Sequence, residues 1–277
     1  MRAAAVQLNS TDDKQRNLEA AERLVHAAAD DGAELIALPE KWNVLGGGEA
    51  LRAGAEEIDG PTITAARSWA RELGIHLVAG SIAERVPGQK RLFNTSVLIG
   101  PDGEVAAAYR KIHMFDVDVG GVAYRESEHE EPGTEIVVAH AGDVPVGLTV
   151  CYDVRFPELY RILAVRGARV IVVPSAFTLH TGKDHWEVLL RARAIENTAF
   201  VVAPNQVGQA PPHYHSYGRS MVLDPWGVVL ATAEDGECFI AAELDFALQD
   251  RIRESLPALA NRRPESYRWP DTSEVPA

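Results

Sequence analysis

Cys151 is the residue whose type and position point most directly to chemistry. An apolar, strand-like run at 144–150 leads into it, and residues 152–158 have the pattern of a turn into a helix. The unpaired amides and positive dipole end of a helix favour the thiolate, which is the form of cysteine that attacks carbon. The position therefore predicts a nucleophile, although a lone free cysteine is more often an inert, buried hydrophobe.

Two other apolar runs end in charged residues. The run 33–40 ends in Glu40, and the run 104–111 ends in Lys111. Sites in open α/β sheets form outside the carboxyl ends of strands, so these two side chains and Cys151 can share one cleft. Glu40 would act as base toward the thiol and later as acid toward a leaving amine. Lys111 would stabilise the oxyanion formed when the thiolate attacks a carbonyl or nitrile carbon, with the Tyr152 amide as second donor.

Composition limits the class of protein. The chain has 277 residues with 46% hydrophobic content, enough for a large core, and no linker, repeat or low-complexity tract divides it. We therefore expect one domain over residues 1–277. The net charge of −13, from 27 basic and 40 acidic side chains, argues against binding nucleic acid or an anionic membrane. The expected partner is a small molecule.

Cysteine usage and the first residues indicate a compartment. Cys151 and Cys238 cannot build a disulfide framework, and a nucleophilic thiol suits a reducing environment. Cys238 precedes an apolar run and is predicted to be strand core. The first nine residues turn polar too early for a signal peptide, and no run approaches the roughly 20 apolar residues of a membrane span. We expect a cytoplasmic protein.

The pattern along the chain predicts an α/β fold. Apolar strand candidates alternate with helical patterns, and turn residues at 101–103 and 224–227 predict hairpins, so the sheets should be mixed. Residues 187–197 carry leucine, alanine and arginine at helical spacing. Arg191 and Arg193 are therefore expected on a packed or solvated helix rather than in catalysis.

Three blocks carry a resemblance to a known family: Ala-Leu-Pro-Glu at 37–40, Tyr-Arg-Lys-Ile-His-Met-Phe-Asp at 109–116, and Val-Cys-Tyr-Asp-Val-Arg-Phe-Pro-Glu-Leu at 150–159. With them the chain resembles the nitrilase, or carbon-nitrogen hydrolase, superfamily over nearly its whole length. The resemblance implies a catalytic set of Glu40, Lys111 and Cys151 in an αββα sandwich. It also implies a homodimer or higher homo-oligomer that pairs through helices and a C-terminal tail from about residue 256. The proposed chemistry needs no cofactor and no metal ion.

The same resemblance adds Glu126 to the site. The family places a second glutamate beside the lysine and the substrate amide, and Glu126 stands at the matching position. The stretch 126–131 is crowded with carboxylates, which by itself favours a solvated acidic loop.

The blocks at 174–197 and 216–227 point to a branch of the superfamily. They resemble the amidases of deaminated glutathione and, next, the omega-amidases of 2-oxo-glutaramate. The resemblance therefore implies hydrolysis of the amide of a small carboxylated 2-oxo acid, with deaminated glutathione preferred. Chemistry alone leaves N-carbamoyl amino acid amidases and nitrilases open, because amides and nitriles both form a covalent adduct on cysteine.

The chain departs from the family pattern at a few positions. Arg219 stands where a histidine is usual, which puts fine substrate recognition in question. Gly120 replaces a common proline and would loosen a loop beside the pocket. Lys41 and Trp42 are unusual after Glu40, and Trp42 either lines the pocket entrance or packs.

Some polar side chains have two interpretations. Arg155, four residues after the nucleophile, either grips a substrate carboxylate or pairs with Glu158 or a neighbouring subunit. His185 and Trp186 lie near the pocket by resemblance, although a capping histidine and a packed tryptophan would explain them equally.

Other functional classes have weaker support. His180, His185, His213 and His215 could ligate a metal, but their spacing is poor and no His-Glu-x-x-His helix is present. A papain-like Cys-His pair lacks a suitably placed histidine. A non-enzymatic binding module would be favoured by loss of Glu40, Lys111 or Cys151, and all three are present.

Overall fold

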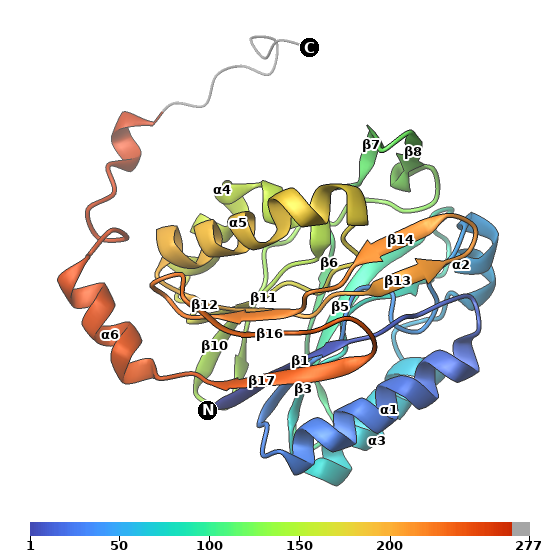
Figure 1. Ribbon diagram of the computed structural model, residues 1–277, viewed down its shortest axis with the longest axis horizontal. Helices are drawn as coiled ribbons and strands as arrows, with labels where there is room; N and C mark the ends of the chain where they lie inside the picture. The colour runs from blue at the N-terminus through green and yellow to red at the C-terminus, as the bar shows by residue number, and fades with distance from the viewer. Residues whose placement is uncertain (268–277) are drawn as a thin grey trace.

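Two β-sheets pack face to face, and each is covered on its outer side by helices (Figure 1). The computed structural model describes residues 1–267. Helices α1 (Lys14–Asp30) and α3 (Pro61–Leu73) cover one sheet, whereas α4 (Pro157–Val165) and α5 (Leu179–Asn197) cover the other. The order of layers is helix, sheet, sheet, helix, which confirms the expected αββα sandwich.

The first sheet has seven strands and mixes parallel with antiparallel pairs. Its strands, in spatial order, are β17 (Cys238–Glu243), β1 (Arg2–Gln7), β2 (Leu35–Ala37), β3 (His76–Val78), β5 (Phe93–Ile99) and β4 (Ile82–Glu84), with β6 (Val105–Arg110) also paired to β5.

The second sheet has six strands, of which β10, β11 and β12 are parallel. Its order is β16 (Val229–Thr232), β15 (Met221–Leu223), β12 (Phe200–Ala203), β11 (Val170–Val172), β10 (Val144–Leu148) and β9 (Val138–Ala141). The smaller elements are the hairpins β7 (Asp116–Val119)–β8 (Val122–Arg125) and β13 (Val207–Ala210)–β14 (Tyr214–Tyr217), helices α2 (Gly48–Gly54) and α6 (Phe246–Ser255), and the 3-10 turns η1 (Glu126–Glu128), η2 (Cys151–Arg155) and η3 (Pro264–Ser266).

Strand β1 shows how the layers are built. Ala3 and Ala5 face the second sheet, whereas Ala4 and Val6 face the outer helices, as the two-residue period of a strand requires. All four are fully buried. A strand covered on both faces reads as a continuous apolar run, which explains the composition of this segment.

Helix α1 illustrates why the outer helices form and where they pack. The side chain of Asp13 accepts from the N–H of Arg16 at 3.1 Å and caps the first turn. Ala21, Leu24 and Val25 lie on the buried face against the first sheet. Burying each of the two larger side chains stabilises the fold by roughly 1.5–3 kcal/mol.

Both predicted hairpins are present. Strands β5 and β6 pair antiparallel around Gly103, with a φ of 76°, and β15 and β16 pair around Gly227, with a φ of 83°. Cys238 lies in a strand as predicted, but it is only half-buried, so its assignment to the core is wrong.

Helix α5 also forms as predicted, and the two arginines differ in their surroundings. Arg193 is buried and donates to the carbonyl of Val154 at 2.8 Å, whereas Arg191 pairs with Glu187 at 3.4 Å in solvent.

Gly120 occupies a regular turn rather than a loosened loop. Gly120 and Gly121 connect β7 to β8, with φ of 61° and 77°, respectively. Two consecutive positive φ values define the tight hairpin turn that matches strand twist, and proline cannot adopt them. The expected loosening is therefore wrong.

Within residues 1–267, no helix has the length and apolar character required to span a membrane.

Candidate active site

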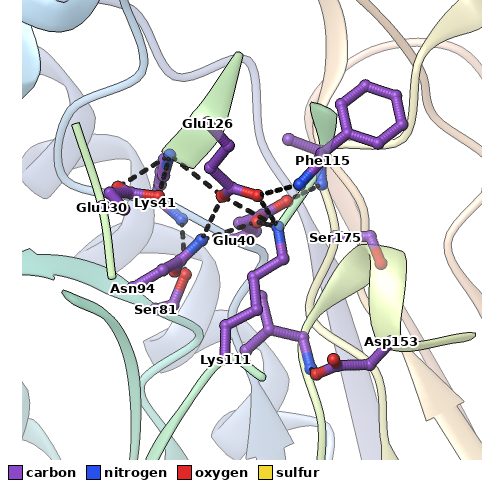
Figure 2. Close-up of polar contacts among 12 residues, drawn as sticks. Glu40, Lys41, Ser81, Asn94, Lys111, Phe115, Glu126, Glu130, Asp153 and Ser175 are labelled. Carbon is purple, nitrogen blue, oxygen red and sulfur yellow. Dashed lines mark hydrogen bonds and ion pairs between the residues drawn. The ribbon is translucent and has the colours of Figure 1, made fainter. Parts of the chain in front are cut away.

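Three strand ends deliver Glu40, Lys111 and Cys151 to one place. Glu40 follows β2 and Lys111 directly follows β6, both in the first sheet, whereas Cys151 follows β10 in the second. Lys111 Nζ lies 3.0 Å from Glu40 Oε1 (Figure 2). The residues are 4%, 1% and 8% exposed, respectively, so the structure brings all three into a buried cluster where the two sheets meet.

Glu126 lies in this cluster rather than on a solvated loop. Its carboxylate accepts two hydrogen bonds from Lys111 Nζ, at 2.9 and 2.8 Å, and one from the N–H of Phe115 at 2.7 Å (Figure 2). Burial opposes its charge, but Lys111 and Lys41 outweigh burial and hold the pKa of Glu126 well below its usual value. Burial likewise opposes the charge of Lys111, but Glu126 and Glu40 keep its pKa well above normal. The pair is therefore ionic.

The Glu40 carboxylate is fixed by two further donors. Asn94 Nδ2 donates to Oε1 at 2.8 Å, and the N–H of Ala176 donates to Oε2 at 2.8 Å. Asn94 also reaches Glu126 Oε1 at 3.2 Å and so connects both carboxylates. Sequence reasoning missed Asn94, although a fully buried asparagine inside an apolar strand is a signal, because such a side chain must find partners.

Cys151 has a left-handed backbone at the first residue of η2, with a φ of 48°. A non-glycine residue in this region is strained, and such strain is concentrated at active sites. The Cys151 N–H donates to the carbonyl of Pro174 at 2.8 Å. The N–H of Tyr152 donates to no acceptor within the described chain and is free to bind an oxyanion.

The thiol differs from what its junction predicts. Burial raises the pKa of Cys151 well above its usual value and the charge of Glu40 raises it further, although Lys111 opposes them. The turn η2 spans only 5 residues, and its dipole is too small to offset burial and a facing carboxylate. The prediction of a favoured thiolate is therefore wrong for the free enzyme, in which burial and the charge of Glu40 favour the neutral thiol.

Asp153, two residues after the thiol, holds the turn in place. Its buried carboxylate accepts from the N–H of Val150 at 2.9 Å and from the hydroxyl of Tyr109 at 2.7 Å, and it lies 2.7 Å from Nδ1 of His113. Tyr109 and His113 flank Lys111 in the chain. Asp153 thus connects the segment that carries the nucleophile to the segment that carries the lysine, a role that sequence reasoning did not assign.

Lys41 is a second buried lysine in the site. Its Nζ lies 3.1 Å from Oε2 of the fully buried Glu130 and 3.6 Å from Glu126 Oε1. Like Cys151, it has a positive φ, of 52°. Its neighbour Trp42 is fully buried and donates to the carbonyl of Ala79 at 3.0 Å, so it packs and does not line the pocket.

A cavity of about 270 Å³ opens above these residues. Such a volume suits a small substrate rather than a polymer. Its floor carries the chemical groups Glu40, Lys111, Glu126 and Cys151, and its walls include Lys41, Phe115, Tyr124, His129, Tyr152, Phe177, Thr181, His213 and Tyr214.

Arg155 contacts two residues that line this cavity. Its guanidinium stands over the rings of Tyr152 and Phe177, 5.9 and 5.4 Å from their centroids, and it contacts His185 Nδ1 at 3.3 Å. Its partner within the chain is therefore His185 rather than the expected Glu158.

Arg219 and Trp186 contact other protein groups and do not line the cavity. The guanidinium of Arg219 contacts Asp235 at 3.1 Å and the carbonyl of Ala233 at 3.1 Å, and Arg219 does not line the cavity. The expected effect of Arg219 on substrate recognition therefore has no support in the site. Trp186 is buried against Phe177, 5.0 Å between ring centroids.

The histidines singled out in the sequence do not form a metal centre in the described part of the chain. No group of three histidine, cysteine, aspartate or glutamate side chains is arranged there to hold a metal ion. His213 lines the cavity, and His185 contacts Arg155.

A buried glutamate, lysine and cysteine between the sheets of an αββα sandwich are the set and the fold that the resemblance to the carbon-nitrogen hydrolases implied. Residues 2–254 match the family model described as carbon-nitrogen hydrolase, and the chain belongs to that family. It is an amidohydrolase.

Relatives of known name span nearly the whole chain. The deaminated glutathione amidase of Synechocystis sp. is 41% identical over 264 residues, covering 94% of this chain and 97% of the relative. The omega-amidase NIT2 of Homo sapiens is 37% identical over 267 residues, covering 96% of each. Among solved structures, the NitFhit protein of C. elegans has a TM-score of 0.89 at 37% identity, and the match covers 96% of this chain and 66% of that one.

Proposed function

We propose that this enzyme hydrolyses the amide bond of a small carboxylated 2-oxo acid amide, with deaminated glutathione as the preferred substrate. The observation that carries this proposal is the hydrogen bond of Lys111 to Glu40, with Cys151 beside them in the lining of the same small cavity. The names of the relatives support the substrate class. The alternative is omega-amidase activity on 2-oxo-glutaramate.

The first half of the reaction forms an acyl-enzyme. Glu40 accepts the thiol proton as Cys151 Sγ attacks the amide carbon, and Lys111 and the Tyr152 N–H stabilise the negative oxygen of the tetrahedral adduct. Glu40 then gives its proton to the amine nitrogen, the carbon-nitrogen bond breaks, and the amine leaves a thioester on Cys151.

The second half releases the acid. Glu40 takes a proton from a water molecule, whose oxygen attacks the thioester carbon, and the carbon-sulfur bond breaks. The proton returns to the departing thiolate, which restores the neutral thiol. Glu126 keeps Lys111 oriented through both halves and can accept a hydrogen bond from the amide nitrogen of the substrate.

The two candidate substrates share their acyl half. Each has a terminal carboxylate beside an oxo group on a short chain that ends in the amide. They differ in the amine half, which is ammonia for 2-oxo-glutaramate and a cysteinylglycine dipeptide for deaminated glutathione. The choice between them therefore depends on what contacts the amine.

Competing the two substrates in one reaction gives the ratio of their specificity constants directly. We expect deaminated glutathione to have the larger kcat/KM, and a preference for 2-oxo-glutaramate, an N-carbamoyl amino acid or a nitrile would overturn the assignment. An electrophilic amide analogue should label Cys151 and spare Cys238, as mass spectrometry of the peptides would show. Dialysis against a chelator should leave the activity intact.

The assembly and location are part of the same proposal. We infer one domain and a homodimer or higher homo-oligomer that pairs through the helical layer. The support is a set of apolar side chains left exposed on α4 and α5, namely Ile162, Val165, Val188 and Ile195. Residues 256–267 of the expected pairing tail are described, whereas residues 268–277 lie outside the described residues. Two free cysteines, one of them the nucleophile, fit the cytoplasm.

A further inference from the structure

The two buried lysines of the site differ in how fully they are bonded. Lys111 Nζ makes three hydrogen bonds to Glu40 and Glu126. Lys41 Nζ makes one within residues 1–267, to Glu130 Oε2. Its contacts with Glu130 Oε1 at 3.0 Å and Glu126 Oε1 at 3.6 Å are ion pairs without hydrogen-bond geometry. An ammonium has three donors, so Lys41 retains two for another acceptor.

Lys41 is also placed to meet a ligand. It lines the cavity, and its left-handed backbone is of the kind that persists where the surrounding structure enforces it for function. Figure 2 shows Lys41 and Glu130 on one side of the Glu40–Lys111 contact, and Asp153, from the turn that carries the nucleophile, on the other. Lys41 therefore lies across the Glu40–Lys111 contact from the turn that carries the nucleophile.

The neighbours of Lys41 leave its charge open to a ligand. Burial raises the pKa of Glu130 above its usual value, and the neighbouring Glu126 adds to this effect, although Lys41 opposes it. A raised pKa weakens Glu130 as a counter-charge for Lys41, and Glu126 already accepts two hydrogen bonds from Lys111. The ammonium of Lys41 is then the charge that a ligand carboxylate can pair with, and a hydrogen bond between ionised groups is stronger than one between neutral groups.

On the basis of the proposed function, we propose that Lys41 binds an anionic group on the amine half of the substrate. Lys41 thereby selects amides of carboxylated amines over primary amides. The leaving nitrogen takes its proton from Glu40, so the amine half must lie on the side of Glu40 and Glu126. Lys41 Nζ is 3.6 Å from Glu126 Oε1 on that side and lines the cavity. The dipeptide carboxylate of deaminated glutathione is such a group, whereas 2-oxo-glutaramate has none.

The test compares deaminated glutathione with its C-terminal carboxamide, which has the same acyl half and the same length but lacks the dipeptide carboxylate. We expect the unmodified enzyme to favour the acid in kcat/KM by about 10- to 100-fold, the range for one hydrogen bond to a charged group. In Lys41→Met this ratio should fall close to one. Lys90→Met, which removes an exposed lysine that does not line the cavity, should keep the original ratio.

Each outcome has a defined meaning. Equal rates on acid and carboxamide in the unmodified enzyme, or an equal loss on both in Lys41→Met, would overturn the proposal and make Lys41 a support for Glu126. Failure of the unmodified enzyme to hydrolyse either compound or 2-oxo-glutaramate would instead overturn the proposed function. Because Lys41→Met leaves the buried Glu130 without its hydrogen-bond partner, Lys41→Met/Glu130→Gln replaces both groups with neutral side chains and should lose the preference in the same way.

Discussion

At the scale of single residues, Glu40 is the group on which both halves of the reaction depend. It accepts a hydrogen bond from Lys111, Asn94 and Ala176 fix its two oxygens, and its charge raises the pKa of the Cys151 thiol. Glu40→Gln keeps the size but cannot accept a proton, so kcat should fall by about 10²–10⁴-fold, the range for a positioned acid-base group. Steady-state kinetics on folded protein would measure this, with the exposed Glu187→Gln as control. A change confined to KM would contradict the assigned role.

The same variant should lower the pKa of the Cys151 thiol and so increase the thiolate fraction, even though activity falls. The Glu40 carboxylate raises the pKa of Cys151, and Lys111 lowers it. Glu40→Gln removes the negative charge that raises the pKa of Cys151 and keeps the Lys111 cation that lowers it, so this pKa should fall. Thiolate absorbance, taken as the difference from Cys151→Ala, would then appear at lower pH than in the unmodified enzyme. An unchanged or raised midpoint would mean that Glu40 does not act on the thiol.

At the scale of elements, Asp153 is the contact that sets η2 against the end of β6. Asp153→Ala would leave four groups without their partner, namely the N–H groups of Val150 and His113, the hydroxyl of Tyr109 and Nδ1 of His113. Each orphaned group costs about 1–3 kcal/mol, so unfolding in urea should begin at clearly lower denaturant, with kcat reduced because Cys151 shares the turn. Asp153→Asn, which retains one acceptor oxygen, should lose less. Stability equal to that of the unmodified enzyme would show that the network is dispensable.

The sequence predicts the site residues that follow strands better than the residues that hold them in position. Glu40, Lys111 and Cys151 each end an apolar run, and a run that stops at a charged or reactive residue is visible locally. Asn94 and Glu130 contribute only through contacts across the fold, with Asn94 and Glu40 54 residues apart and Lys41 and Glu130 89 residues apart. Local patterns do not contain such contacts. The prediction for the thiol pKa is wrong for the same reason, because the residues next to Cys151 in the sequence do not show that a second sheet buries it.

At the scale of the whole molecule, the exposed apolar side chains on α4 and α5 require a partner to be covered. Val188 is 66% exposed at the outer face of the helical layer. If a second copy packs there, Val188→Asp would bury a charge in an apolar contact and should weaken self-association at least about tenfold, which corresponds to roughly 1.4 kcal/mol. Sedimentation at several concentrations would measure the shift, with Glu19→Lys on α1 as control. A monomeric unmodified enzyme would refute the pairing proposal.

The pairing of β17 with β1 has a consequence for how the protein is made. Strand β1 (Arg2–Gln7) is synthesised long before its neighbour on one side, β17 (Cys238–Glu243). Until β17 is made, β1 presents an open edge, and such edges recruit strands from other chains. A ribosome stalled before β17 therefore holds a nascent chain that is prone to association. Synthesis of β17 closes that edge, and completion of the sheet coincides with release from this hazard.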